Sequence, residues 1–249
     1  MTGEGRRIFC ITEAGPLPDM GEDGIYTIPY RDLAAVVRVT PLPSLKPTRE
    51  DLVGHLRVIE QVMGTKTVIP AAFGTIAASE EEVREGLLAS EYEQLRALLE
   101  YLEGRVELGL KVLWKELDAI FAEILAEQEK IRVLREWIAA RPETHTRQQR
   151  IEIGSMVAEA LEAKKRTEGG EILDALTPVA AEARAGKLLG EKMILNAAFL
   201  VERAREAEFD ERVSCLGEQR GQRLSFRYVG PAPPFNFVSL QDLSLTRAT

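Results

Sequence analysis

The sequence predicts an α+β fold of two small domains, residues 1–103 and 104–249, of which the second is ferredoxin-like (split βαβ) and carries a long antiparallel helical hairpin. Two patterns predict this fold. Apolar residues alternate with polar ones over residues 106–112, which is the period of a half-buried strand, and over residues 114–138 they follow the three-four spacing of an amphipathic helix. A chain of 249 residues is long enough to divide into two domains that each bury a core.

The first domain is predicted to begin with strands. We expect them at residues 6–12, 24–28 and 33–39, because these runs are rich in β-favouring residues and are bounded by glycine, proline and aspartate. The segment 41–47 contains three prolines and predicts a loop. A fourth strand is expected at residues 68–70, and the proline that ends it places this strand at a sheet edge or a bulge.

Three helices are predicted in the same domain from their N-terminal caps. Thr48 is the expected N-cap of the first helix, and the pairs Ser79 with Glu82 and Ser90 with Glu93 have the spacing of capping boxes that open two shorter helices. The helical spacing of apolar residues gives the first helix a predicted buried face of Leu52, Leu56, Ile59 and Val62.

The second domain is predicted to follow Gly104 and to contain the hairpin. The hairpin covers residues 114–168, and its two helices are expected to break at Arg141–Pro142 and to pack against each other like an antiparallel coiled coil. Gly169–Gly170 is expected to close the hairpin. The remaining elements are a helical piece at 171–176, strands at 179–183, 193–201 and 223–229, and a helix at 202–216.

Charge and hydropathy restrict the possible partners. Asp and Glu (40 residues) outnumber Lys and Arg (32), which leaves a net charge of −8, so nucleic acid is not an expected partner. No apolar run approaches the roughly 20 residues that span a bilayer. The N-terminus lacks the charged-then-apolar layout of a signal peptide. We therefore expect a cytoplasmic protein without a membrane partner.

The sequence contains no recognisable catalytic motif. It has no Gly-x-Gly-x-x-Gly or Walker loop and no Gly-x-Ser-x-Gly elbow. Its two histidines, His55 and His145, and its two cysteines, Cys10 and Cys215, do not have the spacing of a zinc cluster. No catalytic, cofactor-binding or metal-ligating residue is therefore expected.

His55 borders the apolar face of the first helix. We expect its ring to be partly buried and hydrogen-bonded, and the alternative is a role in proton transfer.

Two segments combine apolar residues with proline, glycine and phenylalanine. They are residues 68–75 and the tail, residues 230–238, which follows the last predicted strand. Proline stiffens an extended chain, so such a segment loses little entropy when it binds a partner. The alternative is that the tail folds back and packs against the end of its own sheet. The candidate docking residues are Phe73, Gly230, Pro231, Pro233, Pro234, Phe235 and Phe237.

Four strings in order carry a resemblance that extends over nearly the whole chain. They are residues 68–75 (VIPAAFGT), 102–112 (LEGRVELGLKV), 196–201 (NAAFLV) and 230–238 (GPAPPFNFV). With them the sequence resembles the gas vesicle protein L/F family. Where that family favours a tryptophan in the terminal string, this chain has Ala232.

The resemblance implies a non-enzymatic, minor structural or accessory protein of gas-vesicle assembly. Such a protein would bind the hydrophobic shell subunit, other accessory proteins of the vesicle, or both during nucleation, and would keep the shell subunit from aggregating. It implies no cofactor and a location in the cytoplasm and at the gas vesicle. An enzyme or small-ligand-binding protein built on the ferredoxin-like unit is the alternative, since that fold serves many functions.

Overall fold

The computed structural model describes residues 3–20, 24–41 and 48–238, and in it the chain forms two compact units. Unit 1 comprises the described residues up to Leu108 together with Leu200–Ala204 and the described residues from Gly230 to Val238. Unit 2 comprises Gly109–Phe199 and Arg205–Val229. Both combine helices with β-sheet, which confirms the predicted α+β class. The compact units differ from the predicted ranges mainly in the tail, which belongs with unit 1.

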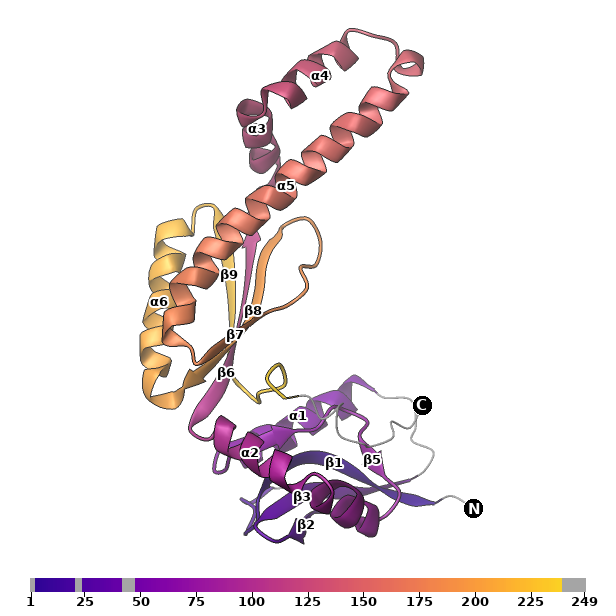
Figure 1. Cartoon of the computed structure of the whole chain (residues 1–249), viewed down its shortest axis with the longest axis vertical. Coiled ribbons are helices and arrows are strands. Elements are labelled where there is room, and N and C mark those ends of the chain that lie inside the picture. The colour runs from indigo at the N-terminus through magenta and orange to yellow at the C-terminus, as the bar shows by residue number, and fades with distance from the viewer. Residues whose placement is uncertain (1–2, 21–23, 42–47, 239–249) are drawn as a thin grey trace. The chain divides into compact units, whose positions relative to one another are not determined.

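Unit 1 is built on a five-stranded sheet in which all the described pairings are antiparallel (Figure 1). The strand order is β2-β3-β1-β4, and β5 also pairs with β1. The predicted strands are confirmed, and Val68–Pro70 ends the sheet path as its proline predicts. The short strand β5 was not predicted. The bounds are β1 Glu4–Glu13, β2 Ile25–Tyr30, β3 Leu33–Pro41, β4 Val68–Pro70 and β5 Ile76–Ala77.

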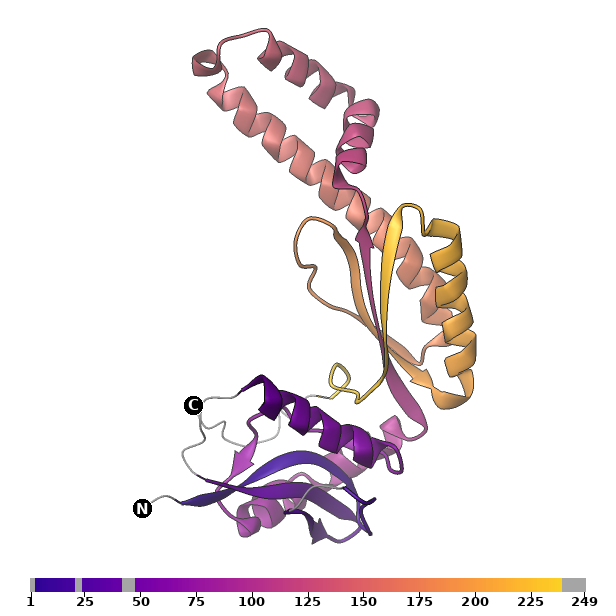
Figure 2. The same cartoon turned by 180° about the vertical axis from the view of Figure 1, so that it is seen from behind.

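Helices cover both faces of this sheet. Helix α1 (Arg49–Met63) and helix α2 (Tyr92–Leu102) lie on opposite sides, as Figures 1 and 2 show, and a π-helix, η1 (Glu82–Ala89), precedes α2. A buried cluster under α1 joins the sheet to the helix. It consists of Phe9, Cys10, Met20, Val36, Val58, Ile59, Val62 and Val68.

The predicted N-cap is confirmed at Thr48. The capping box predicted at Ser79 is confirmed only in its serine half, and the one predicted at Ser90 is wrong. The Thr48 hydroxyl accepts a hydrogen bond from the Asp51 backbone N–H (3.1 Å), and the Asp51 carboxylate accepts one from the Thr48 backbone N–H (3.0 Å). The Ser79 hydroxyl accepts from the Glu82 backbone N–H at 3.1 Å, as predicted. Ser90 does not cap a helix, because its hydroxyl donates back to the Gly86 carbonyl of the preceding turn (2.7 Å).

The predicted buried face of α1 is wrong at two positions. Leu52 and Leu56 are 44% and 40% exposed, whereas Ile59 and Val62 are buried as predicted. The helix is rotated so that His55 and Val58 complete the buried stripe. Both stripes fit helical spacing, so the apolar residues alone could not choose between them.

Most of a four-stranded sheet with the order β7-β8-β6-β9 lies in unit 2. Its strands are β6 Arg105–Trp114, β7 Glu182–Ala185, β8 Met193–Glu202 and β9 Leu224–Ala232. Helices α5 (Arg147–Leu176) and α6 (Glu206–Arg220) lie side by side on one face of this sheet (Figures 1 and 2). The predicted order of strand, helical excursion, strand, strand, helix and strand is therefore confirmed.

The helical hairpin departs from the prediction in three ways. Its first arm is two helices, α3 (Leu117–Glu127) and α4 (Glu129–Ala139), because Gln128 between them has an extended backbone (φ −104°, ψ 90°). Trp114 ends strand β6 instead of starting this arm. The second arm, α5, does not stop at Gly169–Gly170 but continues to Leu176.

Among the described residues, no helix combines the length and apolar character needed to cross a membrane.

An ionic network holds the base of the hairpin to the sheet. Arg223, directly before β9, donates two hydrogen bonds to the Glu123 carboxylate of α3 and two to the Glu168 carboxylate of α5. Glu168 also accepts a hydrogen bond from the indole N–H of Trp114 (2.9 Å), and Lys164 pairs with Glu123 (3.3 Å). These contacts connect residues up to 100 positions apart in the chain.

Glu123→Gln is expected to destabilise unit 2 by about 1 kcal/mol at pH 7, since bidentate charged hydrogen bonds at a partly exposed site are lost. The Arg223 guanidinium lowers the pKa of Glu123 to about 2, below its ordinary value of 4.5. The carboxylate therefore stabilises the fold fully above about pH 4.5, and this contribution is lost as the pH falls toward 2. The difference between the variant and the parent should shrink over that range.

Tryptophan fluorescence during urea unfolding measures this effect in unit 2 alone, because both tryptophans, Trp114 and Trp137, lie in that unit. Glu152→Gln, at an exposed position of α5, is the matched control and should leave the unfolding midpoint unchanged. A Glu123→Gln effect that stays constant from pH 7 to pH 2.5 would contradict the proposed charge pairing.

Candidate functional site

Five side chains of unit 1 form a continuous stack of rings and arginines. The rings of Phe9 (β1) and His55 (α1) are stacked with centroids 5.2 Å apart, and His55 meets the Phe73 ring edge-on at 5.5 Å. The Arg38 guanidinium lies 5.5 Å from the centre of the Phe9 ring, and that of Arg7 lies 5.3 Å from the Phe73 ring. Of the predicted site residues, Phe73 alone lies outside the tail. The structure places its ring in this stack.

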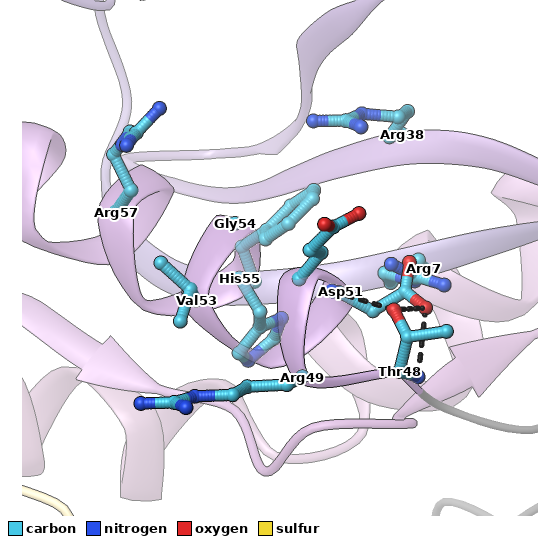
Figure 3. A pocket seen from close by; sticks show the side chains of 11 residues that line it. Arg7, Arg38, Thr48, Arg49, Asp51, Val53, Gly54, His55 and Arg57 are labelled. Atoms are coloured by element: carbon cyan, nitrogen blue, oxygen red, sulfur yellow. Dashed lines mark hydrogen bonds between the residues drawn. The ribbon is translucent and has the colours of Figure 1, made fainter.

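A cavity of about 640 Å³ opens beside the stack, along the first turns of α1 (Figure 3). Arg7 and Arg38 approach it from the sheet, and Arg49 and Arg57 approach it from the helix. Its remaining lining residues are Phe9, Thr48, Glu50, Asp51, Val53, Gly54 and His55. The cavity therefore combines cationic groups with an apolar wall.

The charge of the lining is opposite to that of the chain. Four arginines face two carboxylates, Glu50 and Asp51, while the whole chain has a net charge of −8. The Asp51 carboxylate already accepts hydrogen bonds from Thr48, which hold the pKa of Asp51 below its ordinary value. The lining is suited to an anionic group such as a carboxylate.

His55 has the environment of a packing residue. It is 2% exposed, and its Nε2 lies 2.9 Å from the Ala71 carbonyl, which can only accept, so Nε2 carries the proton and donates. Burial lowers the pKa of His55, and the positive charge of Arg7 lowers it further, so the ring is neutral at pH 7. Its Nδ1 is buried without a hydrogen-bond partner among the described residues. This geometry supports the expected hydrogen-bonded ring over the proton-transfer alternative.

The tail packs within unit 1. Gly230 and Pro231 lie in the end of β9 and are joined by a cis peptide bond, Pro233 and Pro234 are buried, and Phe237 is 4% exposed. Phe235 is half-buried against the cluster that contains Phe9 and Val58. The Glu107 carboxylate accepts hydrogen bonds from the backbone N–H (2.8 Å) and side-chain amide (2.6 Å) of Asn236. This packing supports the alternative in which the tail covers its own fold, and a docking role for it stays a prediction.

The arginines of the cavity were not among the predicted site residues. Arg7, Arg38, Arg49 and Arg57 come from three separate elements, so no local motif joins them. One signal was present, since Arg49, Val53 and Arg57 recur at intervals of four along the first helix. Within the described part of the chain, no group of three or more histidine, cysteine or acidic side chains is placed to hold a metal ion.

Comparison with known proteins finds one family over nearly the whole chain. The model of the family described as gas vesicle synthesis protein GvpL/GvpF matches residues 5–239. Gas vesicle protein F of a Streptomyces strain is 31% identical over 206 residues, which are 83% of this chain and 84% of that protein. The protein of the same name from Dolichospermum flosaquae is 28% identical over 197 residues, 78% of this chain and 79% of the relative.

A solved structure has the same fold. The crystal structure of the gas vesicle protein GvpF from Anabaena sp. PCC7120 superposes with a TM-score of 0.83 at 25% identity and covers 95% of this chain and 99% of that one. The similarity therefore includes both units.

Proposed function

Because the chain belongs to the gas vesicle synthesis protein GvpL/GvpF family, we propose that it is a non-enzymatic accessory protein of gas-vesicle assembly in the cytoplasm. In this proposal it binds the hydrophobic shell subunit, other assembly proteins, or both during nucleation. Binding covers the apolar surface of the shell subunit and so prevents its aggregation before it joins the growing wall.

The match of the family model over residues 5–239 is the observation that carries the proposal. The surface of the chain is compatible with it. Helix α1 exposes Leu52, Val53 and Leu56, and the hairpin exposes Val133 and Ile151, so both units offer apolar side chains to a partner. The net charge of −8 favours solubility of a complex with an apolar subunit.

The cavity beside α1 is the observation that favours the alternative, a small-ligand-binding protein or an enzyme. It gathers ionisable side chains, but its histidine is buried and donates to a backbone carbonyl, and Asp51 is engaged in the helix cap. These residues are suited to holding a charged group and not to moving a proton. Turnover of a small molecule that Arg7→Gln abolishes would favour the alternative.

Co-expression with the gas-vesicle proteins of the same organism tests the proposed function. The tagged chain is expected to retain the shell subunit or another gas-vesicle protein on an affinity column, with mass spectrometry identifying it. Added to dilute denatured shell subunit, the purified chain is expected to reduce light scattering in proportion to its concentration. A chain that retains none of these proteins, leaves the scattering unchanged and is dispensable for vesicles in a deletion strain does not have this function.

A further inference from the structure

Helix α1 has two apolar stripes, and one of them faces away from the core. The inner stripe, His55, Val58, Ile59 and Val62, is buried. The outer stripe lies at positions i, i+3, i+4, i+7 and i+8, which fall on one side of a helix. Its three central residues are 40–49% exposed, an unusual position for three large apolar side chains on two helical turns. The outer stripe consists of Arg49, Leu52, Val53, Leu56 and Arg57.

The charges at the two ends of the outer stripe restrict what can cover it. Arg49 and Arg57 bracket the apolar residues, and both also line the cavity, as does Val53 (Figure 3). Arg7 and Arg38 add two further positive charges on the sheet side. A purely apolar occupant would bury the guanidinium groups of Arg49 and Arg57 without adding a counter-charge, whereas an acidic one would pair with them.

The distance between the two arginines indicates how far apart the carboxylates of the occupant must lie. Arg49 and Arg57 are eight positions apart in a continuous helix, so their Cα atoms lie about 12 Å apart at about 1.5 Å per residue. Two carboxylates seven or eight residues apart on a facing helix have the same separation, and the apolar residues between them would lie over Leu52 and Leu56.

We propose that the outer stripe of α1, together with the adjoining cavity, is the docking groove for an amphipathic segment of a partner protein that carries carboxylates about two helical turns apart and apolar side chains between them. The inference rests on the proposed function, because the partner is then another gas-vesicle protein. A phosphate or nucleotide fits less well. Its charge is concentrated at one point, the Glu50 carboxylate also lines the cavity, and such a ligand would leave the apolar stripe uncovered.

Peptides of 18 residues, tiled across the other gas-vesicle proteins of the same organism, test the groove. Each carries a fluorophore, and fluorescence anisotropy measures its binding to the full chain. Binding is expected from peptides with the acidic and apolar spacing described above. The double variants R49Q/R57Q and L52S/L56S should each weaken that binding about tenfold or more. Raising NaCl from 50 to 500 mM should weaken binding to the parent chain more than it weakens binding to R49Q/R57Q.

Arg166→Gln, at an exposed position of α5 in unit 2, is the matched control and should bind like the parent. All substituted side chains are exposed, and circular dichroism should show parental unfolding midpoints. The proposal is overturned if no peptide binds, or if the best peptides bind both double variants as tightly as the parent. It is equally overturned if inorganic phosphate or ATP saturates the cavity without peptide preference, or if L52S/L56S acts only by dissociating a dimer of this chain.

The co-expression experiment separates this inference from the proposed function. A chain that retains gas-vesicle proteins on the column equally well with and without the R49Q/R57Q change has the proposed function but not this groove. A chain that retains none of them fails the proposed function itself.

Discussion

Gly169→Ala is expected to lower the free energy of unfolding of unit 2 by about 3 kcal/mol. Gly169 is buried where α5 crosses β8, and a methyl group at its Cα would lie 2.2 Å from the Ile194 carbonyl oxygen and 3.1 Å from the carbonyl carbon. Both atoms are backbone, so no side-chain rotation relieves the clash. The helix would have to move away from the sheet, which would open the core around Ile172 and Leu176.

The neighbouring glycine provides the control. Nothing lies within 4 Å of a Cβ added at Gly170, which is in the same helix. Gly170→Ala is therefore expected to stabilise unit 2 by up to about 1 kcal/mol through helix propensity. Urea unfolding followed by tryptophan fluorescence compares the two variants. Equal midpoints for Gly169→Ala and Gly170→Ala would show that α5 does not approach β8 this closely.

Phe237→Ala is expected to cost unit 1 about 3–5 kcal/mol, the range typical for removing a buried phenylalanine. Phe237 is 4% exposed, and the preceding Asn236 is bound at both its backbone and its side chain by the Glu107 carboxylate. The tail is therefore anchored, and loss of the ring would leave a cavity in unit 1 instead of exposing a free end.

Hydrogen exchange of the β1 and α1 amides measures the stability of unit 1 directly, because those elements form its core. Leu52→Ala removes an apolar side chain that is 44% exposed and should change exchange little. If Phe237→Ala leaves exchange unchanged and reduces retention of gas-vesicle proteins, the tail is a docking element, as the candidate residues predict. If it accelerates exchange throughout unit 1, its main role is structural.

Local chemistry made much of the fold predictable from the amino-acid sequence. The period-two pattern after Gly104 identified β6, and Thr48 as the expected N-cap marked the start of α1, because both signals depend on residues only a few positions apart. Pro70 placed β4 at the edge of its sheet for the same reason, since a missing N–H excludes a central position.

The face that α1 buries and the end of α5 were decided by tertiary packing. Leu52 and Ile59 are both apolar residues at helical spacing, and only the shape of the sheet surface determined which one is buried. Gly169–Gly170 usually signals the end of a helix, but Gly169 is required here for the close approach of α5 to β8. A sequence pattern does not encode the distance in space between Gly169 in α5 and Ile194 in β8, which are 25 residues apart in the chain.

The candidate site was likewise determined partly by the sequence and partly by tertiary packing. The sequence by itself determined the family resemblance and the two segments that contain Phe73 and the tail, because these are contiguous strings. Only the tertiary structure decided that Phe73 lies in a stack with His55 and Phe9, that the tail packs within unit 1, and that arginines from β1, β3 and α1 share one cavity. Those arginines are brought together by sheet pairing and helix packing, which are long-range contacts that no local spacing encodes.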